Sequence, residues 1–116
     1  MAPVKIYGIK NCDTMKKAFT WLDTHNHAYD FHDYKKEGAD LDVLKSAIAQ
    51  HGWDTVINRK GTSWRALPDD VKDNMTEKSA IKAAMDNPSL IKRPLLVKGK
   101  TIHLGFTPDD YQKLFK

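Results

Sequence analysis

The chain has 116 residues, of which 41% are hydrophobic and 29% charged, and its formal net charge is +4. This composition is that of an ordinary globular protein, and the length suits one domain with one core. No apolar run approaches the roughly 20 residues of a membrane span, and the basic residues are not gathered into a nucleic-acid-binding face. We therefore expect one domain over residues 1–116 and no membrane or nucleic-acid partner. The net charge of +4 agrees with a protein that binds a small anionic ligand, and equally with one whose solvated surface has a slight excess of positive charge.

The first predicted elements are a strand and a helix that meet at the cysteine. Residues 4–9 are rich in β-branched and aromatic side chains, which is typical of a strand. Apolar residues at helical spacing follow at Met15, Ala18, Phe19 and Leu22. Cys12 therefore lies at or just before a helix N-terminus. Free N–H groups and the helix dipole favour an anion there, which lowers a thiol pKa from about 8.5.

Two interpretations of Cys12 are open at this point. A free cysteine is often a buried structural residue, whereas the polar neighbours Asn11 and Asp13 favour an accessible nucleophile. Asp13 opposes ionisation of the thiol, and three nearby lysines favour it: Lys10, Lys16 and Lys17. Cys12 is also the only cysteine, so an internal disulfide is excluded. This agrees with a reducing compartment, and the chain lacks a secretory signal pattern, so we expect a cytoplasmic protein. Any oxidised form of Cys12 needs an external reductant.

The middle of the chain is predicted to be mainly helical. Residues 29–34 alternate aromatic and polar side chains as a second strand, parallel to the first, and residues 35–38 form a loop. Asp40 is predicted to cap a helix that ends at Gly52. Residues 58–65 break the apolar periodicity and are predicted to be a loop that offers donors to an anion, or a plain surface turn. Further short helices follow, so residues 40–87 form a helical insert.

Strand patterns return near the end of the chain. A strand over Leu95–Val97 follows a proline, and residues 98–100 connect it to an antiparallel strand over Thr101–Leu104. Thr107 is predicted to cap the last helix, with Pro108 in its first turn. The order is β-α-β, a helical insert, then β-β-α, which indicates an α/β fold of the thioredoxin type with a mixed sheet.

Three segments sharpen this interpretation. Residues 7–14 (Tyr-Gly-Ile-Lys-Asn-Cys-Asp-Thr), residues 58–62 (Asn-Arg-Lys-Gly-Thr) and residues 91–97 (Ile-Lys-Arg-Pro-Leu-Leu-Val) resemble the arsenate reductase (ArsC) family. They are most similar to its YffB branch, near the Spx regulators, and the similarity covers essentially the whole chain. The resemblance implies a thioredoxin-like fold with the helical insert between the second and third strands.

The resemblance also assigns roles to particular residues. The family nucleophile falls on Cys12, and two family arginines fall on Arg59, or by a shift of one on Lys60, and on Arg93. The family proline, expected to be cis, is Pro94. Asn11 and Thr14, on either side of Cys12, complete the predicted substrate-binding set with Arg59, Lys60 and Arg93.

The activity implied is that of a thiol reductase that uses glutathione or a glutaredoxin and acts on a disulfide or a small anionic substrate. We expect glutathione as a co-substrate, no bound cofactor or metal, and a monomer. Arsenate reductases of the family carry an arginine shortly after the last strand. Residues 104–107 (Leu-Gly-Phe-Thr) have no cation there, which disfavours arsenate as the substrate.

The alternative function is regulatory. Spx-like relatives bind RNA polymerase and switch through a Cys-x-x-Cys pair. The corresponding residues here run from Cys12 to Met15, so the pair is missing, although a binding role does not depend on it. The five histidines show no metal-ligand spacing. His25 and His27 are predicted to be solvated loop residues, and the three tryptophans to lie in the core or line a groove.

Overall fold

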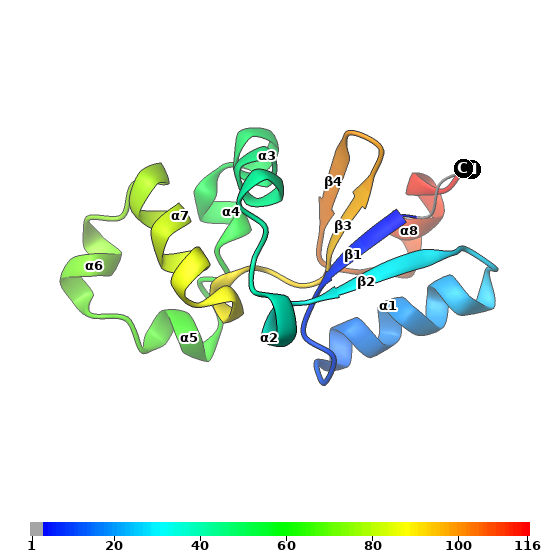
Figure 1. Cartoon of the computed structure of the whole chain (residues 1–116), viewed down its shortest axis with the longest axis horizontal. Helices are drawn as coiled ribbons and strands as arrows, with labels where there is room; N and C mark the ends of the chain where they lie inside the picture. Colours follow the sequence, from blue (N-terminus) through cyan, green and yellow to red (C-terminus); the bar gives the residue numbers. More distant parts are fainter. Residues whose placement is uncertain (1–3) are drawn as a thin grey trace. The chain divides into compact units, whose positions relative to one another are not determined.

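The computed structural model describes residues 4–116. Two compact units emerge from it: one comprises the chain up to Asp33 together with Arg93–Lys116, and the other comprises Tyr34–Lys92 (Figure 1). The first unit holds the sheet, and the second is built from helices that connect the second strand to the third. The predicted α/β, thioredoxin-like architecture with a helical insert is confirmed. That residues 1–116 act as a single domain stays a prediction.

The first unit contains one four-stranded mixed sheet. Its strands are β1 (Val4–Gly8), β2 (Tyr29–Asp33), β3 (Leu95–Lys98) and β4 (Thr101–Leu104), in the spatial order β2-β1-β3-β4. β1 and β2 are parallel, as predicted, because a helix connects them. β3 runs antiparallel to both β1 and β4. This order places β1, which leads to the cysteine, in the middle of the sheet beside β3.

One face of this sheet carries the core of the first unit. Helices α1 (Asp13–Thr24) and α8 (Pro108–Leu114) both pack on it. Met15 and Leu22 of α1 and Tyr111 of α8 meet Ile6 of β1 and Leu96 of β3, and all five side chains are fully buried. Burying an apolar side chain of this size contributes about 1.5–3 kcal/mol. The packing therefore fixes the position of α1, whose first turn carries the cysteine.

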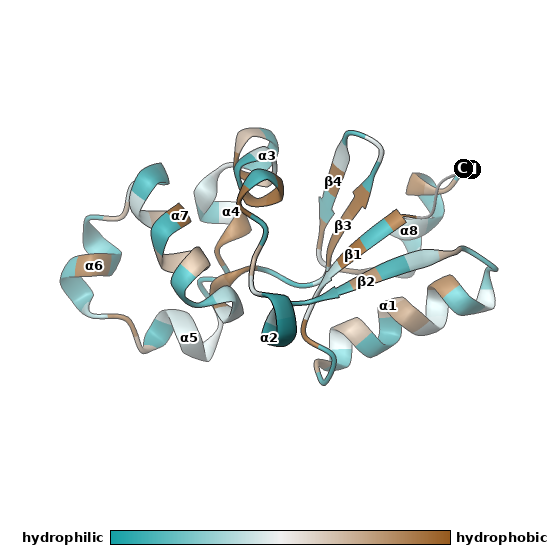
Figure 2. Cartoon of the chain, viewed as in Figure 1, coloured by the Kyte–Doolittle hydropathy of each residue, from teal (hydrophilic) through white to brown (hydrophobic). Residues whose placement is uncertain are grey.

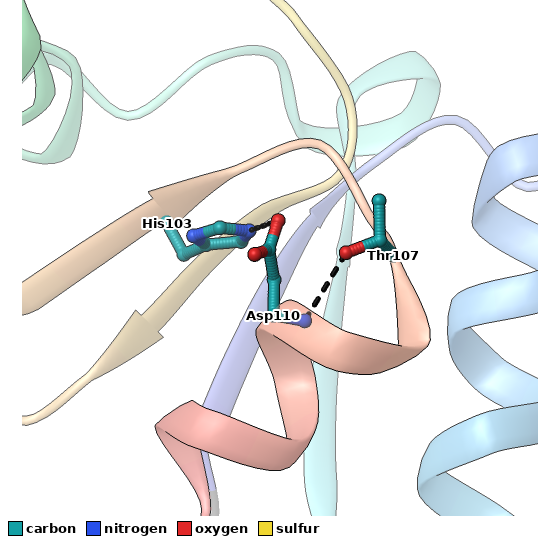
Figure 3. Close-up of polar contacts among 3 residues, drawn as sticks. All are labelled: His103, Thr107 and Asp110. Carbon is teal, nitrogen blue, oxygen red and sulfur yellow. Dashed lines mark hydrogen bonds and ion pairs between the residues drawn. The ribbon is translucent and has the colours of Figure 1, made fainter.

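Two polar contacts fix the start of α8 (Figure 3). The Asp110 N–H donates to Oγ1 of Thr107 at 3.1 Å, so Thr107 is the N-cap, as predicted. Asp110 also reaches back to the sheet, where its Oδ2 lies 3.6 Å from Nε2 of His103 on β4. Pro108 occupies the first turn, where its missing N–H costs nothing.

The second unit consists of short helices: α2 (Tyr34–Glu37), α3 (Leu41–His51), α4 (Trp53–Val56), α5 (Thr62–Arg65), α6 (Asp69–Asp73), α7 (Glu77–Asp86) and the 3₁₀ helix η1 (Pro88–Leu90). Asp40 caps α3 as predicted, accepting the Val43 N–H at 3.1 Å, and Gly52, with a φ of 86°, is the C-cap residue after His51. Ile57 and Ile91 pair in an isolated antiparallel bridge within this unit.

Two predicted loops are partly helical, so these predictions were wrong in part. Residues 35–38 were expected to be a loop, but Tyr34–Glu37 form α2. Tyr34, which was expected to be the last residue of the second strand, is the first residue of this helix and is buried. Apart from Tyr34, this helix is strongly hydrophilic (Figure 2). Residues 58–65 are a turn only as far as Gly61, and α5 begins at Thr62. A helix of four residues is too short to show an apolar period of 3.6.

Within residues 4–116, no helix has both the length and the apolar character needed to cross a membrane.

Candidate functional site

Cys12 is the N-cap residue of α1. Its backbone is extended, with φ −86° and ψ 132°, and its carbonyl accepts the first helical hydrogen bond from the Lys16 N–H at 3.0 Å. The Cys12 N–H donates to the Ile9 carbonyl at 3.3 Å, which closes the tight turn between β1 and the helix. The side chain is half-buried and packs beside the core, so the sulfur is neither sealed in nor fully exposed. The accessible interpretation of this cysteine fits the structure better than the buried structural one.

The surroundings of the sulfur act on its pKa in opposite directions. Burial is the largest single effect and raises the pKa of the Cys12 thiol. The backbone N–H groups of Met15 and Thr14, together with the hydrogen bond and positive charge of Arg93, lower the pKa, and their sum prevails. The two N–H groups face the sulfur at the helix start without reaching full capping geometry. The net result is a Cys12 pKa below its ordinary value, which favours the thiolate.

The pairing of β1 with β3 explains why Arg93 meets a cysteine 81 positions earlier in the chain. Tyr7 of β1 lies opposite Leu95 of β3 in antiparallel register. The chain beyond Tyr7 leads to Cys12, and the chain before Leu95 contains Pro94 and Arg93. Because the strands are antiparallel, these two ends lie at the same edge of the sheet.

The Arg93–Pro94 peptide bond is cis, the isomer expected at this position. Pro94 is buried, and its carbonyl accepts the Gly105 N–H at 2.9 Å. Arg93 itself is half-buried and donates to the thiolate form of Cys12. The segment that carries the arginine is thus tied to the loop that follows β4.

Gly8 allows the helix to approach the end of β1. A Cβ on Gly8 would lie 2.5 Å from Sδ and 2.8 Å from Cε of Met15, and Met15 is fully buried. Any side chain at this position would therefore displace the first turn of α1 or its methionine. A glycine here is required for close packing, and that packing sets the position of Cys12 four residues later.

The other predicted site residues fall into two groups. In the first unit, Thr14 is half-buried in the first turn of α1, and Asn11 is exposed in the preceding turn. In the second unit, Arg59 and Lys60 are exposed in the turn before α5, where the Lys60 N–H donates to Oδ1 of Asn58 at 3.3 Å. The structure thus brings Cys12, Thr14 and Arg93 together, and a role of Arg59 or Lys60 beside them stays a prediction.

The predicted solvated loop environment is confirmed for His25, which is exposed in the turn after α1, and is wrong in part for His27, which lies in the same connection but is half-buried. The ring of His25 stacks on Trp21 at 4.0 Å, and its Nδ1 lies 2.8 Å from the Trp21 carbonyl. His27 stacks on Phe115 at 4.1 Å and is half-buried. Both histidines lie in the connection after α1, and only the tertiary structure brings Phe115 to His27.

A groove along α1 was not predicted as a site. Its volume is about 660 Å³, and residues from α1 and the loop after β4 line it, among them Lys16, Lys17, Trp21, His25, Phe106 and Thr107. Trp21 was expected to lie in the core or line a groove, and it lines this one. Among residues 4–116, no group of three or more His, Cys, Asp or Glu side chains has a geometry that could hold a metal ion.

Comparison with known proteins gives consistent matches over the whole chain. The model of the ArsC family matches residues 7–114. An uncharacterized protein of Haemophilus influenzae is 42% identical over 97% of this chain and 98% of its own. The solved structure of a protein named YffB is 51% identical, with a TM-score of 0.91 over 95% of this chain and 96% of its own.

Two further matches bear on function. The solution structure of an arsenate reductase (ArsC) related protein from Brucella melitensis is 46% identical, with a TM-score of 0.78 over 99% of this chain and 96% of its own. The global transcriptional regulator Spx of Listeria innocua is 24% identical over 95% of this chain and 85% of its own. Each of these is a protein to which the chain is similar.

Proposed function

Because the chain belongs to the ArsC family, we propose that it is a thiol-dependent oxidoreductase in which Cys12 is the nucleophile. The observation that carries this proposal is the setting of the Cys12 sulfur, which faces two N–H groups of a helix N-terminus and the guanidinium of Arg93. A structural cysteine needs no such partners. The similarity to an arsenate reductase related protein supports a reductase over other uses of a thiolate.

The reaction that fits one cysteine is a thiol–disulfide exchange in two steps. In the first, the Cys12 thiolate attacks the glutathione sulfur of a glutathione mixed disulfide, forms a Cys12–glutathione disulfide and releases the substrate as its thiolate. In the second, a glutathione thiolate attacks the glutathione sulfur of that disulfide. Glutathione disulfide leaves and the Cys12 thiolate returns. The net reaction converts one mixed disulfide and one glutathione thiolate into the substrate thiolate and glutathione disulfide, so the sulfur of the incoming glutathione is oxidised as the sulfur of the substrate is reduced.

An external thiol is required in this scheme because the sequence contains one cysteine. A second cysteine would resolve the intermediate within the chain. Here glutathione or a glutaredoxin takes that role as co-substrate or partner.

Positive charge near the sulfur serves both steps. Arg93 stabilises the Cys12 thiolate when it leaves and can pair with a carboxylate of glutathione through its planar fork of donors. We propose that Arg59 or Lys60 binds a second carboxylate, and that Thr14 and Asn11 orient the substrate around the sulfur. These residues offer donors without adding negative charge.

A disulfide suits this site better than arsenate. Residues 104–107 contain no cation, and Phe106 is half-buried against Tyr111, with the ring centroids 4.7 Å apart. An apolar ring therefore occupies the loop in which arsenate reductases of the family carry an arginine. A multiply charged oxyanion would lose a charge-assisted hydrogen bond there, whereas a disulfide carries no charge on its reacting atoms.

The test is the reduction of a glutathione mixed disulfide of a small thiol, with glutathione in excess. The wild type should turn over and Cys12→Ser should not, and mass spectrometry after treatment with glutathione disulfide should find the adduct on Cys12. If the wild type neither turns over nor forms the adduct, the proposal fails. Arsenate, assayed in parallel, should be a poorer substrate.

A second candidate is a regulator that binds RNA polymerase, favoured by the similarity to Spx along 95% of the chain. The chain has one cysteine, so it lacks the second cysteine of a redox switch. Binding to purified RNA polymerase by Cys12→Ser and wild type alike, without turnover of any disulfide, would favour this function over the reductase.

A further inference from the structure

The groove along α1 lies outside the thiol site and has its own construction. It follows α1 from Lys16 to His25, and Phe106, Thr107 and Pro108 form the opposite wall. At 1.5 Å per residue, this stretch of helix is about 14 Å long. An extended peptide advances about 3.3 Å per residue, so the groove has room for about four residues. Its volume of about 660 Å³ lies within the range of ligand-binding sites.

The aromatic walls of the groove are preformed. Trp21 and Phe106 are both half-buried, and both rings meet the ring of Tyr111 edge-on, at 5.6 Å and 4.7 Å between centroids. Tyr111 is fully buried and so holds the two walls from beneath. His25, stacked on the indole at 4.0 Å, extends the aromatic surface along the helix. A ligand with an apolar or aromatic side chain would find aromatic rings to pack against here.

The charge at the groove has one sign. Lys16 and Lys17 are exposed on its rim, and no carboxylate is among the residues that line it. Within the described residues 4–116, neither lysine takes part in an ion pair. The indole N–H of Trp21 likewise has no hydrogen-bond acceptor in that part of the chain and is not buried. The ammonium groups of Lys16 and Lys17 and the indole N–H of Trp21 are therefore available to bind acceptor groups of a ligand.

We propose that this groove binds an acidic peptide segment of a protein partner, with an aromatic or apolar side chain against Trp21 and Phe106 and its carboxylates at Lys16 and Lys17. The proposal goes beyond the reductase function, since none of the groove residues is needed for the exchange at sulfur. A nucleic acid fits less well, because it requires a longer row of cations than two lysines provide. Lys16 lies one helical turn after Cys12, so a bound segment would hold its protein close to the thiol.

The test uses the full chain with Cys12→Ser, which removes thiol chemistry while keeping a good N-cap. The probe is a capped peptide of about six residues, long enough to fill the groove, in which glutamate alternates with phenylalanine. A matched peptide carries lysine in place of glutamate. Binding is followed by NMR through the indole N–H signals of the three tryptophans. Trp21 should shift on titration, whereas Trp53 and Trp64, which do not line the groove, should not.

Charge reversal of Lys16 and Lys17 to glutamate should weaken the acidic peptide by about tenfold, which is the size of two partly exposed ion pairs. The lysine peptide should bind the wild-type groove more weakly than the acidic peptide does. It should bind the charge-reversed groove more tightly than the acidic peptide does. The matched control reverses two exposed lysines of the second unit, Lys45→Glu with Lys78→Glu, and should leave the affinity unchanged. Circular dichroism checks that every variant folds.

The proposal would be overturned by no shift of the Trp21 indole with the acidic peptide, by equal binding of both peptides, by equal weakening by the control pair, or by a larger Trp21 shift with a single-stranded oligonucleotide than with the peptide. A Trp21 signal that moves with protein concentration alone would assign the groove to a second copy of the chain and would also overturn it. Since Cys12 is absent in the test, none of these results bears on the reductase.

Discussion

Replacement of Gly8 by alanine tests the close packing that positions the cysteine. The new methyl group would lie 2.5 Å from Sδ and 2.8 Å from Cε of Met15, well inside contact distance. Met15 is fully buried, so its terminal atoms can move only by displacing neighbours. We expect Gly8→Ala to lower the free energy of unfolding by about 1–3 kcal/mol, the usual cost of an extra methyl group in a packed core.

A second substitution separates this overlap from a general intolerance of alanine in β1. Met15→Ala alone should cost about 2–5 kcal/mol, because it leaves a cavity. In the double variant, the methyl group of Ala at position 8 occupies part of the space that Met15 vacates. The loss of unfolding free energy in the double variant should therefore be smaller, by about 1 kcal/mol or more, than the sum of the losses in the two single variants.

The assay is urea unfolding followed by circular dichroism for the wild type, both single variants and the double variant. A Gly8→Ala protein as stable as the wild type would refute the overlap, and strictly additive costs would show that Gly8 and Met15 do not compete for the same space. Alkylation of the Cys12 thiolate shows which group moves: it should slow if Gly8→Ala displaces the first turn of α1 and stay unchanged if only the end of the Met15 side chain moves.

Three further predictions follow from the same structure. Tyr111→Phe should raise the free energy of unfolding by about 1 kcal/mol, because the Tyr111 hydroxyl is buried without a hydrogen-bond partner among residues 4–116; urea unfolding would refute this by showing a loss. The pKa of Cys12 is lower in the folded than in the unfolded chain, so its contribution to stability is fully present above about pH 8.5 and is lost as the pH falls through the folded pKa. The wild type should therefore gain stability relative to Cys12→Ser as the pH rises towards that value, and a constant difference would contradict this. Arg93→Gln removes one positive charge and should raise the Cys12 pKa, seen as slower alkylation near neutral pH, whereas Lys113→Gln, an exposed control on α8, should leave the alkylation rate unchanged.

Much of the fold could be predicted from local signals in the sequence. Asp40 and Thr107 cap the helices that they were expected to cap, and the connections between strands give the observed parallel and antiparallel pairs. These features depend on residues close together in the chain. The helix over Tyr34–Glu37 was missed because one turn carries no periodic pattern, and Tyr34 continues the alternation of the strand before it.

The site shows a similar division. The place of Cys12 at a helix N-terminus follows from the change of apolar period around it, but the partnership of Cys12 with Arg93 depends on the pairing of β1 with β3, which no local pattern encodes. That partner came from the family resemblance. The groove escaped prediction because Lys16 and Lys17 on one helix look like an ordinary solvated face. Only the packing of Trp21 and Phe106 on Tyr111 shows that an apolar surface lies beside them.

The most direct test of the activated thiolate is the rate of alkylation of Cys12 by iodoacetamide as a function of pH, with free N-acetylcysteine in the same buffers as the reference. The rate follows the thiolate fraction, so its midpoint reports the pKa. We expect a midpoint for the folded protein below that of the reference, and a return to the reference midpoint when the protein is unfolded in urea. A folded midpoint at or above about 8.5, the value of an ordinary cysteine, would contradict it.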